Sequence, residues 1–124
     1  MRCIALYVWV HSLTDARLSR LPLLTNASLA ALKCNPPAAS LAVTLATRAL
    51  NLGSLTPAEK GKALYRRALG KVQLKDEEEA EKDLKEALEA VPGDAGIIKA
   101  LKDVEARSKA RRDKEKKAYG KLFG

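Results

Sequence analysis

Apolar side chains recur along this chain at intervals of three and four residues, in runs that proline and glycine separate. The first run covers residues 21–32 and ends before Pro36 and Pro37, which cannot continue a helix. The second covers residues 39–52 and ends before Gly53, a residue type that often follows a helix. Such intervals place apolar side chains on one helical face. The sequence therefore predicts two successive helices here.

A third helix is predicted to begin just after Thr56. Threonine is a favoured N-cap residue, and Pro57 suits the first helical turn. Glu59 places an acid in that turn, where the helix dipole favours it. This helix should run to about Leu74.

Two more helices follow. Asp76 with Glu79 has the spacing of a capping box, and Asp94 is a candidate N-cap for the last helix. Their expected packing faces consist of Ala80, Leu84, Ala87 and Leu88 in one and of Ile97, Leu101 and Val104 in the other. Because no segment alternates with the two-residue period of a strand, we predict an all-α fold of antiparallel helix hairpins.

Composition agrees with helix-on-helix packing. Only 4% of the residues are aromatic and 31% are charged, so Leu, Ala, Val and Ile must build the core. The net charge of +8 is concentrated at one end, because residues 107–124 carry eight Lys and Arg against two acids. The positive field therefore belongs to a C-terminal basic helix, which we place at residues 95–124.

Little in the chain points to metal, cofactor or redox chemistry. Cys3 and Cys34 lack the spacing of metal ligands, and as lone thiols they suit a reducing, cytoplasmic location. His11 has no acid or cysteine at ligand spacing. We therefore predict no metal site, no cofactor and no catalytic residues.

Residues 1–20 form an atypical N-terminal segment. The opening "MRCIALYVWV" resembles the apolar part of a signal peptide, but no convincing cleavage site follows. The run is also too short to span a bilayer. We expect a cytosolic segment without a membrane role.

The helical segments form an internal repeat. Ala68 and Ala80 fall where the two helices of one hairpin approach closely, so residues 61–94 resemble a tetratricopeptide (TPR) unit. A looser unit covers residues 21–53, and residues 54–60 link the two. The predicted TPR region is thus 21–94, about two repeats. Arg67 and Lys71 depart from the usual apolar residues, so their face should be solvated.

Residues 62–124 resemble the C-terminal part of cyclophilin-40-type large immunophilins, the peptidyl-prolyl cis-trans isomerase D family. The resemblance rests on "KALYRRALG", "DLKEAL" and "RRDKEKKAYGKLFG". It implies a truncated, fungal-like member with TPR repeats and a long capping helix. The isomerase domain of that family has no counterpart in this sequence, so we expect no enzyme here and treat any isomerase label as inherited.

The resemblance also implies a peptide-binding site. Proteins of this family grip the acidic C-terminal tail of heat shock protein 90 with a carboxylate clamp, whose pattern falls on Asn26, Lys62 and Arg66. Arginine offers a planar fork for a carboxylate and lysine a point charge. Arg67 is a possible additional contact. The family's first-repeat clamp residues have no match in residues 1–20, so we expect a partial clamp.

Three other interpretations stay open. Lys62 and Arg66 can simply form the solvated side of a helix. The basic end, with Tyr119 and Phe123, can bind an acidic partner, or the chain can be a non-functional piece of a larger isomerase. Nucleic acid is not expected, because RNA recognition uses more exposed aromatics. The sequence leaves the oligomeric state open.

Overall fold

A computed structural model describes residues 20–34, 37–53 and 55–123, and all of its regular secondary structure is helical. The interpretations of Cys3, of His11 and of the segment before Arg20 lie outside the described residues. The helices are α2 (Arg20–Lys33), α3 (Ala39–Leu50), α4 (Pro57–Gln73), α5 (Glu77–Ala90) and α6 (Ala95–Phe123). The prediction of an all-α fold is confirmed.

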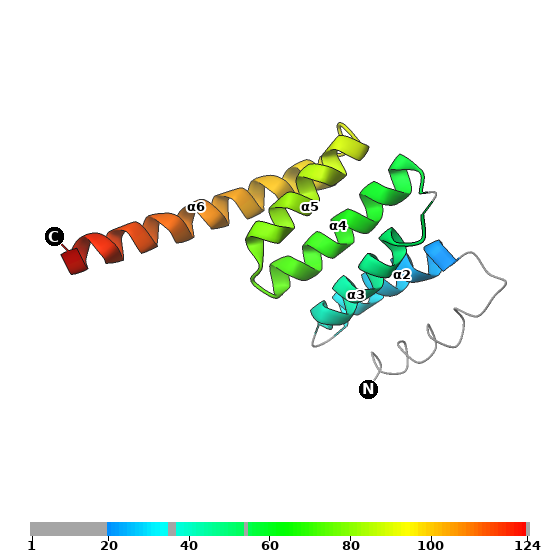
Figure 1. The fold of residues 1–124 in the computed structure, drawn as a ribbon, viewed down its shortest axis with the longest axis horizontal. Coiled ribbons are helices and arrows are strands. Elements are labelled where there is room, and N and C mark those ends of the chain that lie inside the picture. The colour runs from blue at the N-terminus through cyan, green and yellow to red at the C-terminus, as the bar shows by residue number, and fades with distance from the viewer. Residues whose placement is uncertain (1–19, 35–36, 54, 124) are drawn as a thin grey trace.

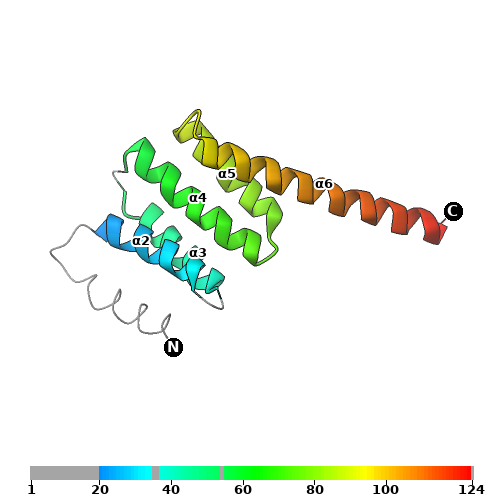
Figure 2. The ribbon, with the colours of Figure 1, turned by 180° about the vertical axis from the view of Figure 1, so that it is seen from behind.

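The helices stack as hairpins. α2 packs on α3, α3 on α4, α4 on α5 and α5 on α6, and α2 also contacts α4. In Figure 1 α3 and α5 face the viewer, whereas in Figure 2 α2 and α6 do. This arrangement is TPR-like, because the first helices of successive hairpins lie on one side of the stack and the second helices on the other.

Most of the capping residues predicted at the helix ends are confirmed. Thr56 and Glu59 form a reciprocal capping box at the start of α4. The backbone N–H of Ile97 donates to Asp94 Oδ1 at 3.1 Å, so Asp94 caps α6. Gly53 has a φ of +70°, a conformation that favours glycine after a helix. α4 begins at Pro57, as predicted, so its first turn lies inside the segment 54–60 that we assigned as the link between the repeats.

The capping box predicted at Asp76 is wrong. Asp76 precedes α5, but its side chain caps no backbone N–H. Its intended partner is engaged elsewhere, since Glu79 Oε1 accepts from Lys82 Nζ at 2.5 Å. Within α5, Glu79 therefore forms an ion pair with Lys82 instead of a reciprocal cap with Asp76.

Small side chains let the hairpins pack closely. Ala68 and Ala80 are both fully buried in the cluster that joins α4, α5 and α6, as their spacing predicted. A second cluster joins α2, α3 and α4 around Leu45, which is also fully buried. The core is thus made of alanine and leucine between helices.

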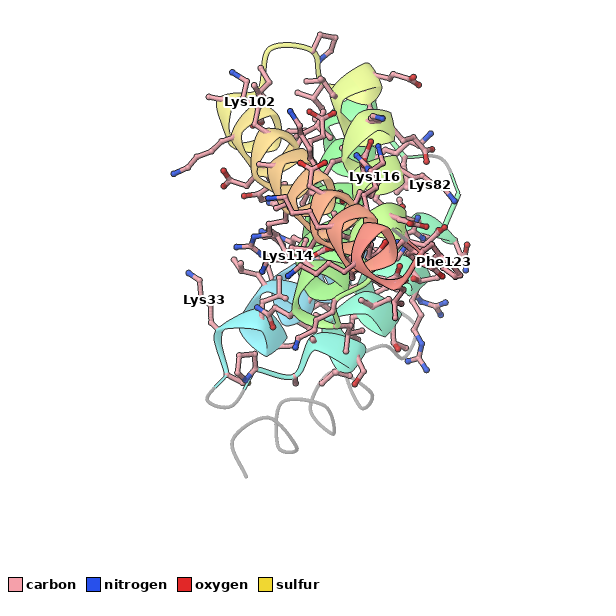
Figure 3. All side chains as sticks on the ribbon, turned by 90° about the vertical axis from the view of Figure 1, so that its left-hand side faces the viewer. Lys33, Lys82, Lys102, Lys114, Lys116 and Phe123 are labelled. Atoms are coloured by element: carbon pink, nitrogen blue, oxygen red, sulfur yellow. The ribbon has the colours of Figure 1, made fainter. Side chains whose placement is uncertain are left out.

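Only the first half of α6 packs on the body. Ile97, Val104 and Ser108 are buried, whereas every residue from 112 to 123 is exposed. Arg111 marks the boundary, with Nη1 2.8 Å from Glu77 Oε2 of α5. Figures 1 and 2 show the helix continuing past the body, and Figure 3 shows Lys114, Lys116 and Phe123 along this end. The long C-terminal helix expected at residues 95–124 is confirmed.

Two further findings concern the chain as a whole. Cys34, just after α2, is disulfide-bonded, so the expectation of a lone thiol is wrong for this residue. Among the described residues, none of the helices has the length and apolar character needed to cross a bilayer.

Candidate functional site

Asn26 of α2 and Lys62 of α4 line the same hollow between these two helices. The hollow has a volume of about 230 Å³, and its other lining residues are Leu21, Pro22, Thr25 and Glu59. Both predicted site residues are exposed to solvent. The contact between α2 and α4 brings together an amide and an ammonium group that lie far apart in the sequence.

Arg66 lies one helical turn beyond Lys62 but is buried, with 8% of its surface exposed. Its Nη1 donates a hydrogen bond to the backbone carbonyl of Thr25, which also lines the hollow. This bond places the guanidinium beside the hollow. The guanidinium of Arg66 has five N–H donors, and the Thr25 carbonyl accepts from only one of its nitrogens.

Within the described residues, neither Lys62 nor Arg66 is paired with a carboxylate. Loss of water around the buried group lowers the pKa of Arg66. A buried cation without a counter-ion is costly, because nothing replaces the hydration that it loses. Glu59, the acid in the hollow, already accepts a hydrogen bond from the backbone N–H of Thr56 at 2.9 Å.

Arg67 has the opposite surroundings. Its Nε and Nη2 donate to the two oxygens of Asp83 on α5, at 2.8 and 2.6 Å. These hydrogen bonds raise the pKa of Arg67 despite its partial burial. Lys71 Nζ lies 2.9 Å from the same carboxylate. Arg67 is therefore held on the α5 side, and the additional contact suggested for it has no support in this arrangement.

The solvated face expected for Arg67 and Lys71 is wrong for the same reason. Their side chains are only 20% and 15% exposed, because both neutralise the buried carboxylate of Asp83. This role is hard to predict, since Asp83 looks like one more acid in an acid-rich helix. Its place among the buried positions of α5, one residue before Leu84, was the available signal.

The arrangement is suited to holding an anion. The hollow itself offers the Asn26 amide and the Lys62 ammonium to a carboxylate, whereas Arg66 does not line it and adjoins it through the Thr25 carbonyl. No group of side chains in the described part of the chain is arranged to hold a metal ion. The hollow thus carries donors that suit an anion, together with the acid Glu59.

The sequence is similar to part of three curated proteins, although no model of a known protein family matches it. It is similar to peptidyl-prolyl cis-trans isomerase D from two strains of Cryptococcus neoformans var. neoformans serotype D, with 64% identity over 107 residues. That match covers 85% of this chain and 28% of each relative. The protein of the same name from Mycosarcoma maydis is 38% identical over 111 residues, which is 79% of this chain and 28% of the relative. The chain thus spans little more than a quarter of these relatives.

Proposed function

We propose that this chain, a homologue of one part of peptidyl-prolyl cis-trans isomerase D, is a peptide-binding module that holds the acidic C-terminal tail of a heat shock protein 90 chaperone. One observation carries the proposal. Arg66 is buried without a described acidic partner beside a hollow that Asn26 and Lys62 line. A ligand carboxylate would supply the missing counter-charge.

Each of the three residues has a separate task in this proposal. Arg66 donates from its free guanidinium nitrogens to one carboxylate, in a place where water competes little. Lys62 contributes a mobile point charge at the mouth of the hollow and neutralises the second carboxylate of a terminal aspartate. Asn26 donates its amide without adding charge. Together they select a free chain end over an internal acidic segment.

Two features limit the affinity. Glu59 adds a negative charge to the wall of the hollow, even though its carboxylate is engaged in the capping box. The clamp residues of the family's first repeat are also missing from residues 1–20. We expect tighter binding in relatives with a complete clamp.

Isomerase activity is a property named for the whole relatives, of which this chain matches about a quarter, and we do not propose it for the described helices. We propose a cytoplasmic location only because such a chaperone tail is available there, since the disulfide at Cys34 removes the argument from lone thiols. An acidic partner for the exposed end of α6 stays a prediction.

Binding of a labelled Met-Glu-Glu-Val-Asp peptide tests the proposal by fluorescence anisotropy. The free-acid peptide should bind, its C-terminally amidated form should bind at least about tenfold more weakly, and Lys62→Ala/Arg66→Ala should abolish binding, because each change removes a charge-assisted bond.

The matched control is Lys60→Ala, which removes a cation from the same helix at a position that pairs with Glu86 on α5. It should leave the affinity within about twofold, a difference below 1 kcal/mol. Equal binding of the acid and amide peptides would defeat the proposal.

A further inference from the structure

The exposed end of α6 carries three large apolar side chains that adjoin one another. Tyr119, Leu122 and Phe123 lie within little more than one helical turn, and their exposed fractions are 64%, 77% and 83%. The rings of Tyr119 and Phe123 stack, with their centroids 6.0 Å apart and their planes at 14°. We call these three residues the apolar tip. Exposed apolar side chains that gather in this way indicate a contact surface, unlike scattered ones.

Bases surround the apolar tip. The segment 112–123 holds five Lys and Arg against two acids, and all of its residues are exposed. None of these bases is in a described ion pair. Because successive side chains are ~100° apart around a helix, Lys114 and Lys116 lie on different sides of α6, as Figure 3 shows. The five bases are Arg112, Lys114, Lys116, Lys117 and Lys121.

The apolar face of this end is short. One and two turns before the apolar tip, the same face of α6 carries Glu115, Arg112 and Arg111. A helix that fills a groove of a partner protein presents apolar anchors over several turns, at intervals of three and four residues. The anchors of α6 are confined to its last turns. This pattern favours a partner that is apolar only at a shallow depth and negative over a wide area.

The surface of a bilayer that contains anionic lipids has both of these properties. Its headgroups attract Lys and Arg, and aromatic side chains settle at the level of the headgroups. A lysine can lay its aliphatic stem along the apolar boundary while its ammonium reaches a lipid phosphate. A short helix end with an apolar tip and flanking bases can therefore lie at such a surface.

Only the end of α6 is suited to this surface. The first turn of α5 holds Glu77, Glu78 and Glu79, which a negative surface repels. Arg111 pairs with Glu77 at the edge of the body, and the apolar tip lies further along the helix. Figures 1 and 2 show that this end continues past the other helices, so the body does not obstruct its approach.

We infer that the exposed end of α6 binds peripherally to membrane surfaces that contain anionic phospholipids. The apolar tip enters the headgroup layer, and the bases around it pair with the lipid phosphates and carboxylates. The attachment is reversible, because only three large apolar side chains are inserted. This inference is independent of the proposed function, since none of these residues lines the hollow between α2 and α4.

Flotation of the whole chain with vesicles tests the inference. Vesicles in which about 30% of the lipid is phosphatidylserine should bind at least about tenfold more strongly than vesicles of phosphatidylcholine alone, because each base gains energy at a negative surface. Added salt should weaken the binding, since it screens these attractions. Equal binding to the two kinds of vesicle would overturn the inference.

Variants assign the binding to the tip and to the bases. Leu122→Ser/Phe123→Ser and Lys114→Gln/Lys116→Gln should each lower binding to the anionic vesicles at least about tenfold. The matched control Lys33→Gln/Lys102→Gln removes the same charge from exposed positions on the body, which Figure 3 also labels, and should stay within about twofold of wild type. An equal loss in the control would overturn the inference, because the binding would then follow net charge.

Hydrogen exchange locates the contact. In the presence of the anionic vesicles, amides of residues 112–123 should gain protection, whereas those of α4 should not change. Protection that arises only outside α6 would overturn the inference, since another part of the chain would then bind the lipid. If no vesicle binds, the inference fails and an acidic protein stays the expected partner of this end. Peptide binding by Leu122→Ser/Phe123→Ser should equal that of wild type, so failure here leaves the proposed function untouched.

Discussion

At the scale of single residues, Arg66 and Arg67 are neighbours in the chain with opposite surroundings. Arg67 has a buried carboxylate as its partner, and Arg66 has only a backbone carbonyl. The hydrogen bonds to Asp83 therefore raise the pKa of Arg67, whereas burial lowers the pKa of Arg66. Arg66 is thus held at some cost to the free protein, and the anion binding that we propose would offset that cost.

This reasoning predicts that stability and binding separate at Arg66. Arg66→Met keeps most of the side-chain volume and removes a buried charge, so the free energy of unfolding in urea should stay within about 1 kcal/mol of wild type or increase. Peptide affinity should nevertheless fall at least about tenfold, because a charge-assisted bond is lost. A loss of more than about 2 kcal/mol of stability would instead make Arg66 a structural residue.

At the scale of helices, close approach is set by glycine and alanine. A Cβ placed on Gly70 of α4 would lie 2.8 Å from Val43 Cγ2 and 3.1 Å from the carbonyl oxygen of Ala39, both on α3. A Cβ on Gly120 of α6 would meet nothing within 4 Å. The same residue type is therefore required in one helix and dispensable in the other.

Alanine substitution should have opposite effects at these two glycines. Gly70→Ala pushes α3 away from α4 and should cost about 1–3 kcal/mol of unfolding free energy through overpacking. Gly120→Ala should be neutral or stabilising by up to about 1 kcal/mol, since alanine favours the helix. Chemical denaturation of both variants measures the difference, and a similar loss at Gly120 would contradict this account.

Helix ends were predictable from the sequence because caps and breakers act locally. Thr56 with Pro57 and Glu59 specifies the start of α4 whatever packs around it. Contacts between helices were not predictable in this way. The partnership of Asp83 with Arg67 depends on how α4 and α5 face each other, so these residues looked solvated. The site residues Asn26 and Lys62 came from a family resemblance rather than from local patterns, and their roles stay predictions.

At the scale of the whole molecule, order should decrease from the stack toward the end of α6. The stack holds α2 to α5 and the first half of α6 in apolar clusters. Residues 112–123 of α6 contribute no buried side chain, and a helical segment of that length has little stability alone.

Hydrogen exchange measured by mass spectrometry should show this gradient. Amides in residues 112–123 should exchange fastest among the described helices, and those in α4 around the buried Leu64 slowest, because local opening is cheap where few apolar contacts are lost. Strong protection at the end of α6 in a dilute sample would mean that another surface covers it.

The length of α6 has a consequence for how the molecule can be arranged around two partners. From Arg111, where α6 makes its ion pair with α5, to Phe123, twelve residues of helix extend for about 18 Å. A protein bound near Phe123 would therefore lie well away from the hollow between α2 and α4, so binding at one of these sites need not obstruct binding at the other. The exposed end of α6 is therefore long enough to separate a peptide bound on the body of the molecule from a protein bound near Phe123.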